Sequence, residues 1–138
     1  QAGFLNYTLH PKAGSVSNLT LTGTSPNFTY TFGTSIDMQS LDGYVLNIGD
    51  YILLKNQTTT SQNGLYLVSA KSTTAFTLVK QTNPTDSYVV PVKFGKINKD
   101  KYFKYTSSTN TYSETDIQKK AIVYSKNGYI KRIEELNG

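Results

Sequence analysis

Few side chains in this sequence are of a type that carries acid–base or nucleophilic chemistry. His10 is the only histidine, and no other ligand type stands near it at a metal-binding spacing. A Ser-His-Asp triad would also have to use it. The sequence contains no cysteine, which excludes a disulfide, a thiolate nucleophile and a cysteine zinc site. We therefore expect no metal and no cofactor, and we interpret His10 as an exposed polar residue.

The carboxylates are also few. A glycosidase needs two carboxyl groups that face each other about 5–9.5 Å apart, and only 9 Asp and Glu residues are present. Asp42 and Asp50 each stand beside a glycine, where a tight turn accounts for them. Together with Asp37 they are too widely spaced for a calcium loop. We expect no enzyme, and a small glycan depolymerase is the least favoured alternative.

The positive charge is concentrated late in the chain. The formal net charge is +5, and lysines are interleaved with aromatic residues between positions 93 and 105. Such a stretch can bind single-stranded nucleic acid, whereas the simpler interpretation is an edge strand whose lysines prevent edge pairing. We favour the second and expect no nucleic-acid partner. Any interaction surface here is expected to include Lys93, Lys96, Lys101, Tyr102, Lys104, Tyr105 and Tyr112.

The composition is that of a small β protein. Tyrosine is abundant at 11 residues and charged residues make up only 17% of the chain, and aromatic and β-branched side chains suit pleated, half-buried surfaces. A chain of 138 residues is long enough for one domain. We place that domain at residues 1–133 and a frayed tail or linker at 134–138. No apolar run of about 20 residues is present, so we expect no membrane insertion.

Alternating residues and short apolar runs predict a series of strands. Pro91 lies inside one of them and cannot donate a ladder hydrogen bond, so that strand is expected at an edge or a bulge. We expect an all-β fold, a compact antiparallel β-sandwich or a small β-barrel. The predicted strands are residues 16–24, 27–32, 44–47, 51–55, 65–70, 75–80, 87–94, and the hairpin 101–106 with 111–112.

The two ends of the chain carry weaker signals. Ser113–Asp116 has the spacing of a capping box before residues 117–121, which would form at most one short helical turn. Against a longer helix, Asn127-Gly128 suits a turn that would fold residues 121–133 into a hairpin. Residues 2–10 alternate weakly, and Pro11–Gly14 are expected to end that first strand.

Residues 41–70 hold the densest turn and strand signals. Three dipeptides, each with a glycine that accepts a positive φ, mark a hairpin and two corners. Two amide side chains follow the first apolar run, and they are expected to hydrogen-bond loop backbone that has no strand partner. We interpret eight residues as structural turn and loop residues: Asp42, Gly43, Gly49, Asp50, Asn56, Gln57, Asn63 and Gly64.

This stretch resembles a pattern found in bacteriophage virion proteins of the tail-fibre, baseplate and head-decoration kind, with relatives in some large DNA viruses of eukaryotes. The pattern is Asp-Gly, a short apolar piece, Gly-Asp, an apolar strand, a Lys-(Asn/Asp)-Gln loop, Asn-Gly and an apolar strand containing tyrosine. It differs at Tyr51, where an arginine is usual, and at Phe76–Lys80, which stands in place of Trp-Thr-Arg. The matching residues are Asp42-Gly43, Val45-Leu46, Gly49-Asp50, Ile52–Leu54, Lys55–Thr58, Asn63-Gly64 and Leu65–Val68.

The resemblance implies a small, non-enzymatic β domain located in a virion. Such a domain is expected to act in virion assembly and, through an exposed surface, in attachment to a host glycan. Its expected partners are other virion proteins and further copies of itself, as a homo-oligomer or on a lattice. The main alternative is a bacterial surface adhesin module. Adhesin β domains can be locked by a Lys–Asn isopeptide bond, and Lys55, Asn56 and Asn63 supply those residue types.

Overall fold

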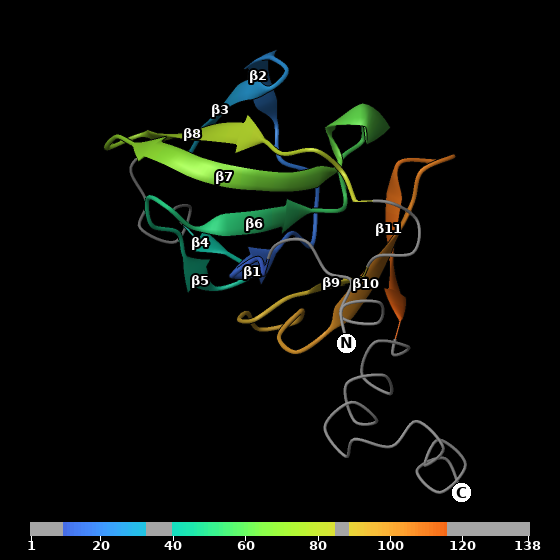
Figure 1. The fold of residues 1–138 in the computed structure, drawn as a ribbon. Helices are drawn as coiled ribbons and strands as arrows, with labels where there is room; N and C mark the ends of the chain where they lie inside the picture. Colours follow the sequence, from blue (N-terminus) through green and yellow to red (C-terminus); the bar gives the residue numbers. More distant parts are fainter. Residues whose placement is uncertain (1–9, 33–39, 85–88, 116–138) are drawn as a thin grey trace, which may run out of the picture.

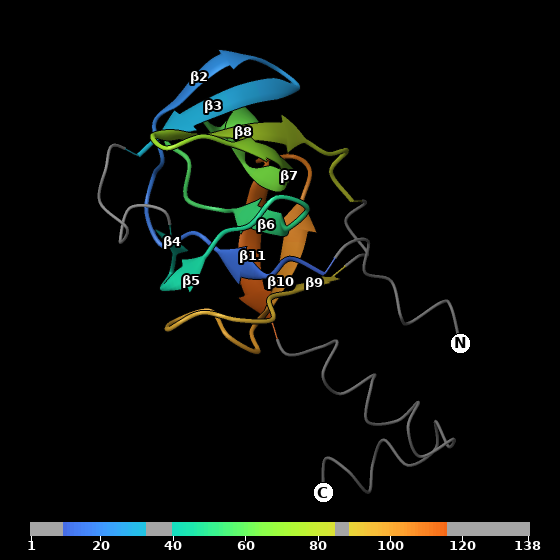
Figure 2. The ribbon, with the colours of Figure 1, turned by 90° about the vertical axis from the view of Figure 1, so that its left-hand side faces the viewer.

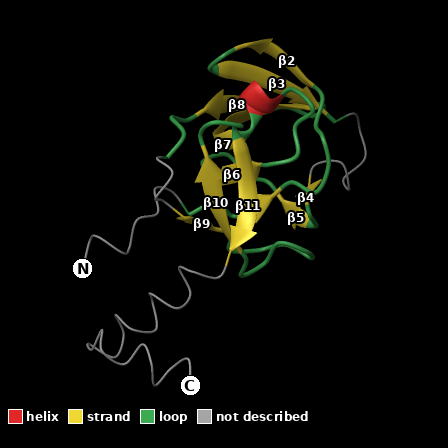
Figure 3. Cartoon of the chain, turned by 90° about the vertical axis from the view of Figure 1, so that its right-hand side faces the viewer, coloured by secondary structure: helices red, strands yellow, loops and turns green. Residues whose placement is uncertain are grey.

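Strands dominate the architecture of this chain (Figure 1). The computed structural model describes residues 10–32, 40–84 and 89–115. Within these residues the regular structure consists of 11 strands and one 3-10 helix, Thr60–Gln62. Figure 3 shows this helical turn among the strands and loops. The predicted all-β class is confirmed.

The larger sheet has six strands. In spatial order the strands are β1 (Ala13–Gly14), β6 (Tyr51–Leu54), β7 (Gly64–Lys71), β8 (Ala75–Lys80), β3 (Asn27–Thr31) and β2 (Leu21–Thr24). The first pair, β1 and β6, is parallel, and every other neighbouring pair is antiparallel. The register between β7 and β8 shifts between Val68 and Ala70, which marks a β-bulge.

A smaller sheet and a short hairpin complete the described fold. The smaller sheet has the order β11 (Thr111–Thr115), β10 (Tyr102–Thr106) and β9 (Val89–Pro91), and the hairpin pairs β4 (Ser40–Leu41) with β5 (Tyr44–Val45). Figure 2 shows β10 and β11 beside β6 and β7, at the opposite end from the β2–β3 hairpin. The sheets are arranged like a sandwich, and the described strands do not close into a barrel.

Strands β6 and β7 are buried on both faces. On one face Leu53 and Leu65 pack against the smaller sheet, in a core that includes Phe103. On the other face Ile52 and Tyr66 pack in a second core with residues of β3 and β8. Successive side chains of a strand point to opposite faces, so two cores require apolar residues at every position. This is why the two strands appear in the sequence as continuous apolar runs.

Several predicted strands are confirmed. Residues Asn27–Thr31 and Ala75–Lys80 form β3 and β8, and β7 returns antiparallel to β6. The hairpin about Ser107–Asn110 pairs Thr106 with Thr111. Strand β9, which contains Pro91, is an edge strand of the smaller sheet, as a proline that lacks an N–H requires.

Other predictions at the N-terminal side were wrong. The predicted strand 16–24 is reduced to β2, because the segment before Leu21 bonds to a loop instead of a strand. Pro11–Gly14 do not simply end a strand, since Ala13 and Gly14 pair in parallel with Ile52 and Leu53. The strand predicted at residues 2–10 lies almost wholly outside the described residues.

The C-terminal predictions are resolved only in part. Ser113 and Glu114 do not begin a helical turn, because they belong to β11 and pair with Lys104 and Phe103 of β10. The predicted helical turn at residues 117–121, the hairpin at 121–133 and the tail at 134–138 lie outside the described residues.

Candidate functional site

The loop after β6 is held by the buried side chain of Gln57. Its Oε1 accepts the Leu19 N–H at 2.9 Å, and its Nε2 donates to the Leu19 carbonyl at 2.7 Å. The same Nε2 lies 3.0 Å from Gln62 Oε1. Gln57 is only 4% exposed, so these bonds satisfy an amide that water does not reach. Its side chain supplies the hydrogen bonds that a neighbouring strand would give to Leu19.

Asn63 closes the other end of this loop. Its Oδ1 accepts the Gln57 N–H at 2.8 Å, and its Nδ2 donates to the Asn110 carbonyl at 2.8 Å. Gly64 follows, and a Cβ at this position would lie 2.7 Å from Asn83 Oδ1. Asn63 thus joins the larger sheet to the β10–β11 turn, while Gly64 leaves room for the Asn83 side chain that follows β8.

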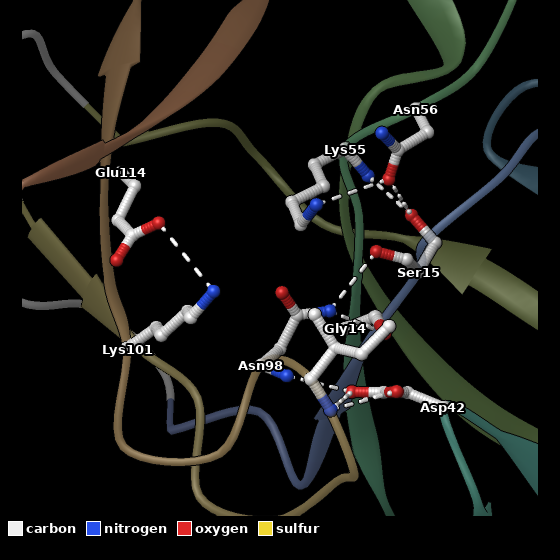
Figure 4. A network of polar contacts seen from close by, with 9 residues as sticks. Gly14, Ser15, Asp42, Lys55, Asn56, Asn98, Lys101 and Glu114 are labelled. Carbon is white, nitrogen blue, oxygen red and sulfur yellow. Dashed lines mark hydrogen bonds and ion pairs between the residues drawn. The ribbon is translucent and has the colours of Figure 1, made fainter.

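Asn56 and Lys55 form a second junction with Ser15 (Figure 4). The Ser15 hydroxyl is fully buried, accepts the Lys55 N–H at 2.9 Å and donates to Asn56 Oδ1 at 3.0 Å. Lys55 Nζ donates to the same oxygen at 3.2 Å. Burial, together with the neighbouring Lys101, lowers the pKa of Lys55. Since Lys55 and Asn56 are neighbours in the chain, this contact is a local hydrogen bond and not a cross-link between strands.

Asp42 fastens the β4–β5 hairpin to a distant loop (Figure 4). Asp42 and Gly43 both have positive φ, 51° and 83°, as a tight two-residue turn requires. The Asp42 carboxylate accepts the Ile97 N–H at 3.0 Å and the Asn98 N–H at 2.8 Å. The buried Asn98 amide then donates to the carbonyls of Gly14 and Ser15 at 3.0 and 3.1 Å.

The Gly49-Asp50 corner is built in the same way. The buried Asp50 accepts the Asn47 N–H at 2.9 Å, while Gly49 takes a φ of 93°. Burial, with a smaller contribution from Asp50, raises the pKa of Tyr44. Sequence reasoning identified the turn residues, but it missed Ser15 and Asn98. A lone polar residue in a loop carries no periodic signal that would indicate its burial.

Two tyrosines expected at an interaction surface are instead part of the core. Tyr105 and Tyr112 are only 4% and 7% exposed, and their rings pack 4.9 Å apart between centroids. The Tyr112 hydroxyl donates to Asn83 Oδ1 at 3.0 Å, and the Tyr105 hydroxyl donates to Asn110 Oδ1 at 2.6 Å. Burial raises the pKa of Tyr112. These two residues therefore do not contribute to a surface.

The predicted edge strand of lysines is also a wrong interpretation. Strand β10, which carries Lys104, is the middle strand of the smaller sheet, and Lys93 and Lys96 lie in the loop between β9 and β10. Lys93, Lys96 and Lys104 are exposed. Lys101 is half-buried, and its Nζ lies 3.6 Å from Glu114 Oε1 (Figure 4). The structure thus separates the predicted cluster into a basic loop and side chains on the smaller sheet.

A shallow hollow lies beside this loop. It has a volume of about 190 Å³, which is below the roughly 300–1,000 Å³ of typical ligand pockets. The exposed His10 and the half-buried Tyr102 border it. Among residues 10–32, 40–84 and 89–115, no group of three or more His, Cys, Asp or Glu side chains could hold a metal ion. The lining residues are His10, Pro91, Val92, Lys93, Asp100 and Tyr102.

Comparison with known proteins gives no relative for this chain. No family model, no curated protein and no solved structure matches it. In the part of the chain that the structure describes, no helix is long and apolar enough to cross a membrane. Functional inference therefore depends on the geometry and on the sequence pattern of residues 41–70.

Proposed function

We propose that this chain is a non-enzymatic structural domain of a virion, of the tail-fibre, baseplate or head-decoration kind. One observation supports the proposal most strongly. Several polar side chains of the resembling stretch direct hydrogen bonds at main-chain groups, as in Asp42 to Ile97 and Asn98, or Gln57 to Leu19. Asp50 and Asn63 do the same. Asn56 is an exception, because it bonds other side chains. A pattern whose polar residues serve turns and junctions specifies a shape, which is what an assembly component needs.

The domain would act through shape and repetition. Virion proteins present many copies on one particle, so weak individual contacts add through a high effective concentration. The β4–β5 hairpin and the loop after β6 are fixed to other parts of the fold by the bonds described above. A domain of this kind offers firm surfaces to its neighbours without needing a deep pocket.

Deletion of the gene in the virus that carries it tests this proposal. Particles from the deletion strain are imaged by electron cryomicroscopy and compared with particles complemented by the wild-type gene. We expect missing density, incomplete assembly or a loss of adsorption to host cells. Fully infectious particles with an unchanged density map would contradict the proposal.

A further inference from the structure

One end of the molecule combines exposed apolar side chains with lysines. The rings of Tyr44 and Phe94 stack with centroids 5.3 Å apart and an interplanar angle of 3°. Lys12 Nζ and Lys93 Nζ lie 5.9 and 5.6 Å from the Phe94 ring centroid. The side chain of Lys96 covers the backbone of the β4–β5 turn. We call this surface the basic–apolar end and define it by Lys12, Tyr44, Lys93, Phe94, Lys96 and Ile97.

The apolar part of this end is unusually exposed. Ile97 is 57% exposed and Phe94 is 37% exposed, although the loop that carries them is bonded firmly to Asp42. Val45 and Ile48, on β5 and in the turn that follows, are exposed as well. Exposed apolar clusters on a firmly held surface mark sites of protein interaction.

Within the described part of the chain, no carboxylate forms an ion pair with the lysines of this end. Lys12, Lys93 and Lys96 have no ion-pair partner among the described residues, and Lys93 and Lys96 are exposed. The nearby carboxylate of Asp42 is occupied by main-chain N–H groups. Exposed apolar side chains beside polar or charged ones are found at protein–protein interfaces, and lysines without an ion-pair partner among the described residues favour a partner of opposite charge.

We propose that the basic–apolar end docks an acidic protein surface that presents an apolar or aromatic side chain at its centre. A nucleic acid fits less well, because sequence-tolerant binding of single strands relies on open aromatic faces. The Phe94 ring is already stacked on Tyr44 and approached by two ammonium groups. The exposed Ile97 side chain would also find no apolar surface to pack against on a phosphate backbone.

A second copy of this chain fits less well for a different reason. Within residues 10–32, 40–84 and 89–115, the exposed carboxylates are those of Asp100 and Glu114. Glu114 already lies near Lys101. The described surface therefore offers little negative charge to meet Lys93 and Lys96 of another copy, and this favours a different, acidic protein as the occupant.

Binding of defined polymers to the purified full chain tests this inference. The probes are a fluorescent random copolymer of glutamate and tyrosine and a polyglutamate of matched length. We expect the copolymer to bind about tenfold more tightly, because it adds apolar contacts to the charge. Ile97→Ser should remove most of that difference, and Lys93→Glu with Lys96→Glu should weaken both polymers about tenfold and flatten the salt dependence.

The control is Lys104→Glu, which changes an exposed lysine on β10 outside the basic–apolar end. It should alter binding by no more than about twofold, and circular dichroism verifies the fold of each variant. Equal binding of the two polymers, or equal losses in Lys104→Glu and Lys93→Glu, would overturn the inference. Tighter binding of dextran sulfate or duplex DNA than of the copolymer would also overturn it.

Sedimentation adds one further outcome. Self-association of the chain that Ile97→Ser abolishes would assign this end to a second copy and so contradict the acidic partner. All of these measurements use purified protein. The binding assays can therefore contradict an acidic partner while the particle experiment supports the virion role. They can also support an acidic partner if the chain belongs to another kind of assembly.

Discussion

At the scale of single residues, the side-chain amide of Gln57 makes the two hydrogen bonds to Leu19 that the backbone of a neighbouring strand would otherwise make. It bonds both the N–H and the carbonyl of a residue 38 positions away. The sequence predicted that Asn56 and Gln57 would bond loop backbone, because amides do so in loops. This is confirmed for Gln57 and wrong for Asn56, whose Oδ1 accepts from the Ser15 hydroxyl and the Lys55 ammonium. The sequence could not predict the partner of Gln57, since no local pattern connects residues so far apart.

Replacing Gln57 by leucine tests the importance of this contact. The substitution roughly keeps the side-chain volume but leaves the Leu19 N–H and carbonyl without their partners. We expect the free energy of unfolding to fall by about 2–4 kcal/mol, measured by urea denaturation. Thr58→Ala, at the exposed neighbouring position, is the control and should change stability by less than about 0.5 kcal/mol. A Gln57→Leu protein as stable as wild type would show that the hydrogen bonds between Gln57 and Leu19 do not stabilise the fold.

At the scale of elements, strands with strong alternation were predictable and strands set by tertiary contacts were not. Asn27–Thr31 alternates aromatic and threonine residues, and it forms β3 as expected. By contrast, Ala13-Gly14 has no strand pattern, and it becomes β1 because Ile52 and Leu53 of β6 present a free edge beside it. The segment before Leu21 alternates well, yet its hydrogen bonds go to the loop after β6.

The candidate surface was predicted in the same uneven way. Lys93 and Lys96 are exposed as expected, while Tyr105 and Tyr112 are buried. Their role in the core depends on Asn83 and Asn110, which come from separate turns. The contact of Tyr44 with Phe94 joins elements about fifty positions apart in the sequence, so only the fold could show that these residues share a surface.

The β4–β5 turn gives a test at the element scale. Gly43 has a φ of 83°, and an added Cβ would lie 2.8 Å from Lys96 Cε. Gly43→Ala should lower the free energy of unfolding by about 1–2 kcal/mol for the left-handed backbone, with a smaller extra loss from the lysine contact. Gly49→Ala is the matched control, because Gly49 has a φ of 93° but nothing within 4 Å of an added Cβ.

A double substitution separates the backbone strain at position 43 from the contact with Lys96. In a Lys96→Ala protein, Gly43→Ala should lower the free energy of unfolding, measured by thermal unfolding, by no more than Gly49→Ala does. A Gly43→Ala variant with unchanged stability would contradict the turn geometry.

At the scale of the whole molecule, two cores share strands β6 and β7. Each core buries one tyrosine whose pKa burial raises above the ordinary value of 10.0, Tyr66 in one and Tyr112 in the other. A raised pKa means that the folded state favours the neutral phenol. The contribution of this effect to the free energy of unfolding is fully present below pH 10, the value for an unfolded chain, and declines as the pH rises above 10.

We therefore expect the chain to unfold cooperatively in alkali, with the two tyrosines ionising only as it unfolds. Burial lowers the pKa values of Lys55 and Lys80, which acts in the opposite direction over part of this range. Tyr112→Phe isolates the tyrosine contribution, and it should make the decline above pH 10 shallower. Ultraviolet absorbance of tyrosinate, recorded beside circular dichroism, checks this. Ionisation of all tyrosines at pH 10 in folded protein would contradict the burial of Tyr66 and Tyr112.

The proposed function places the whole molecule in a virus particle, and quantitative mass spectrometry of gradient-purified virions measures whether it is there. We expect peptides of this chain in the particle fraction, at a copy number in fixed proportion to the major capsid or tail proteins and resistant to washing with high salt. Peptides found in infected cells but absent from purified particles would contradict it.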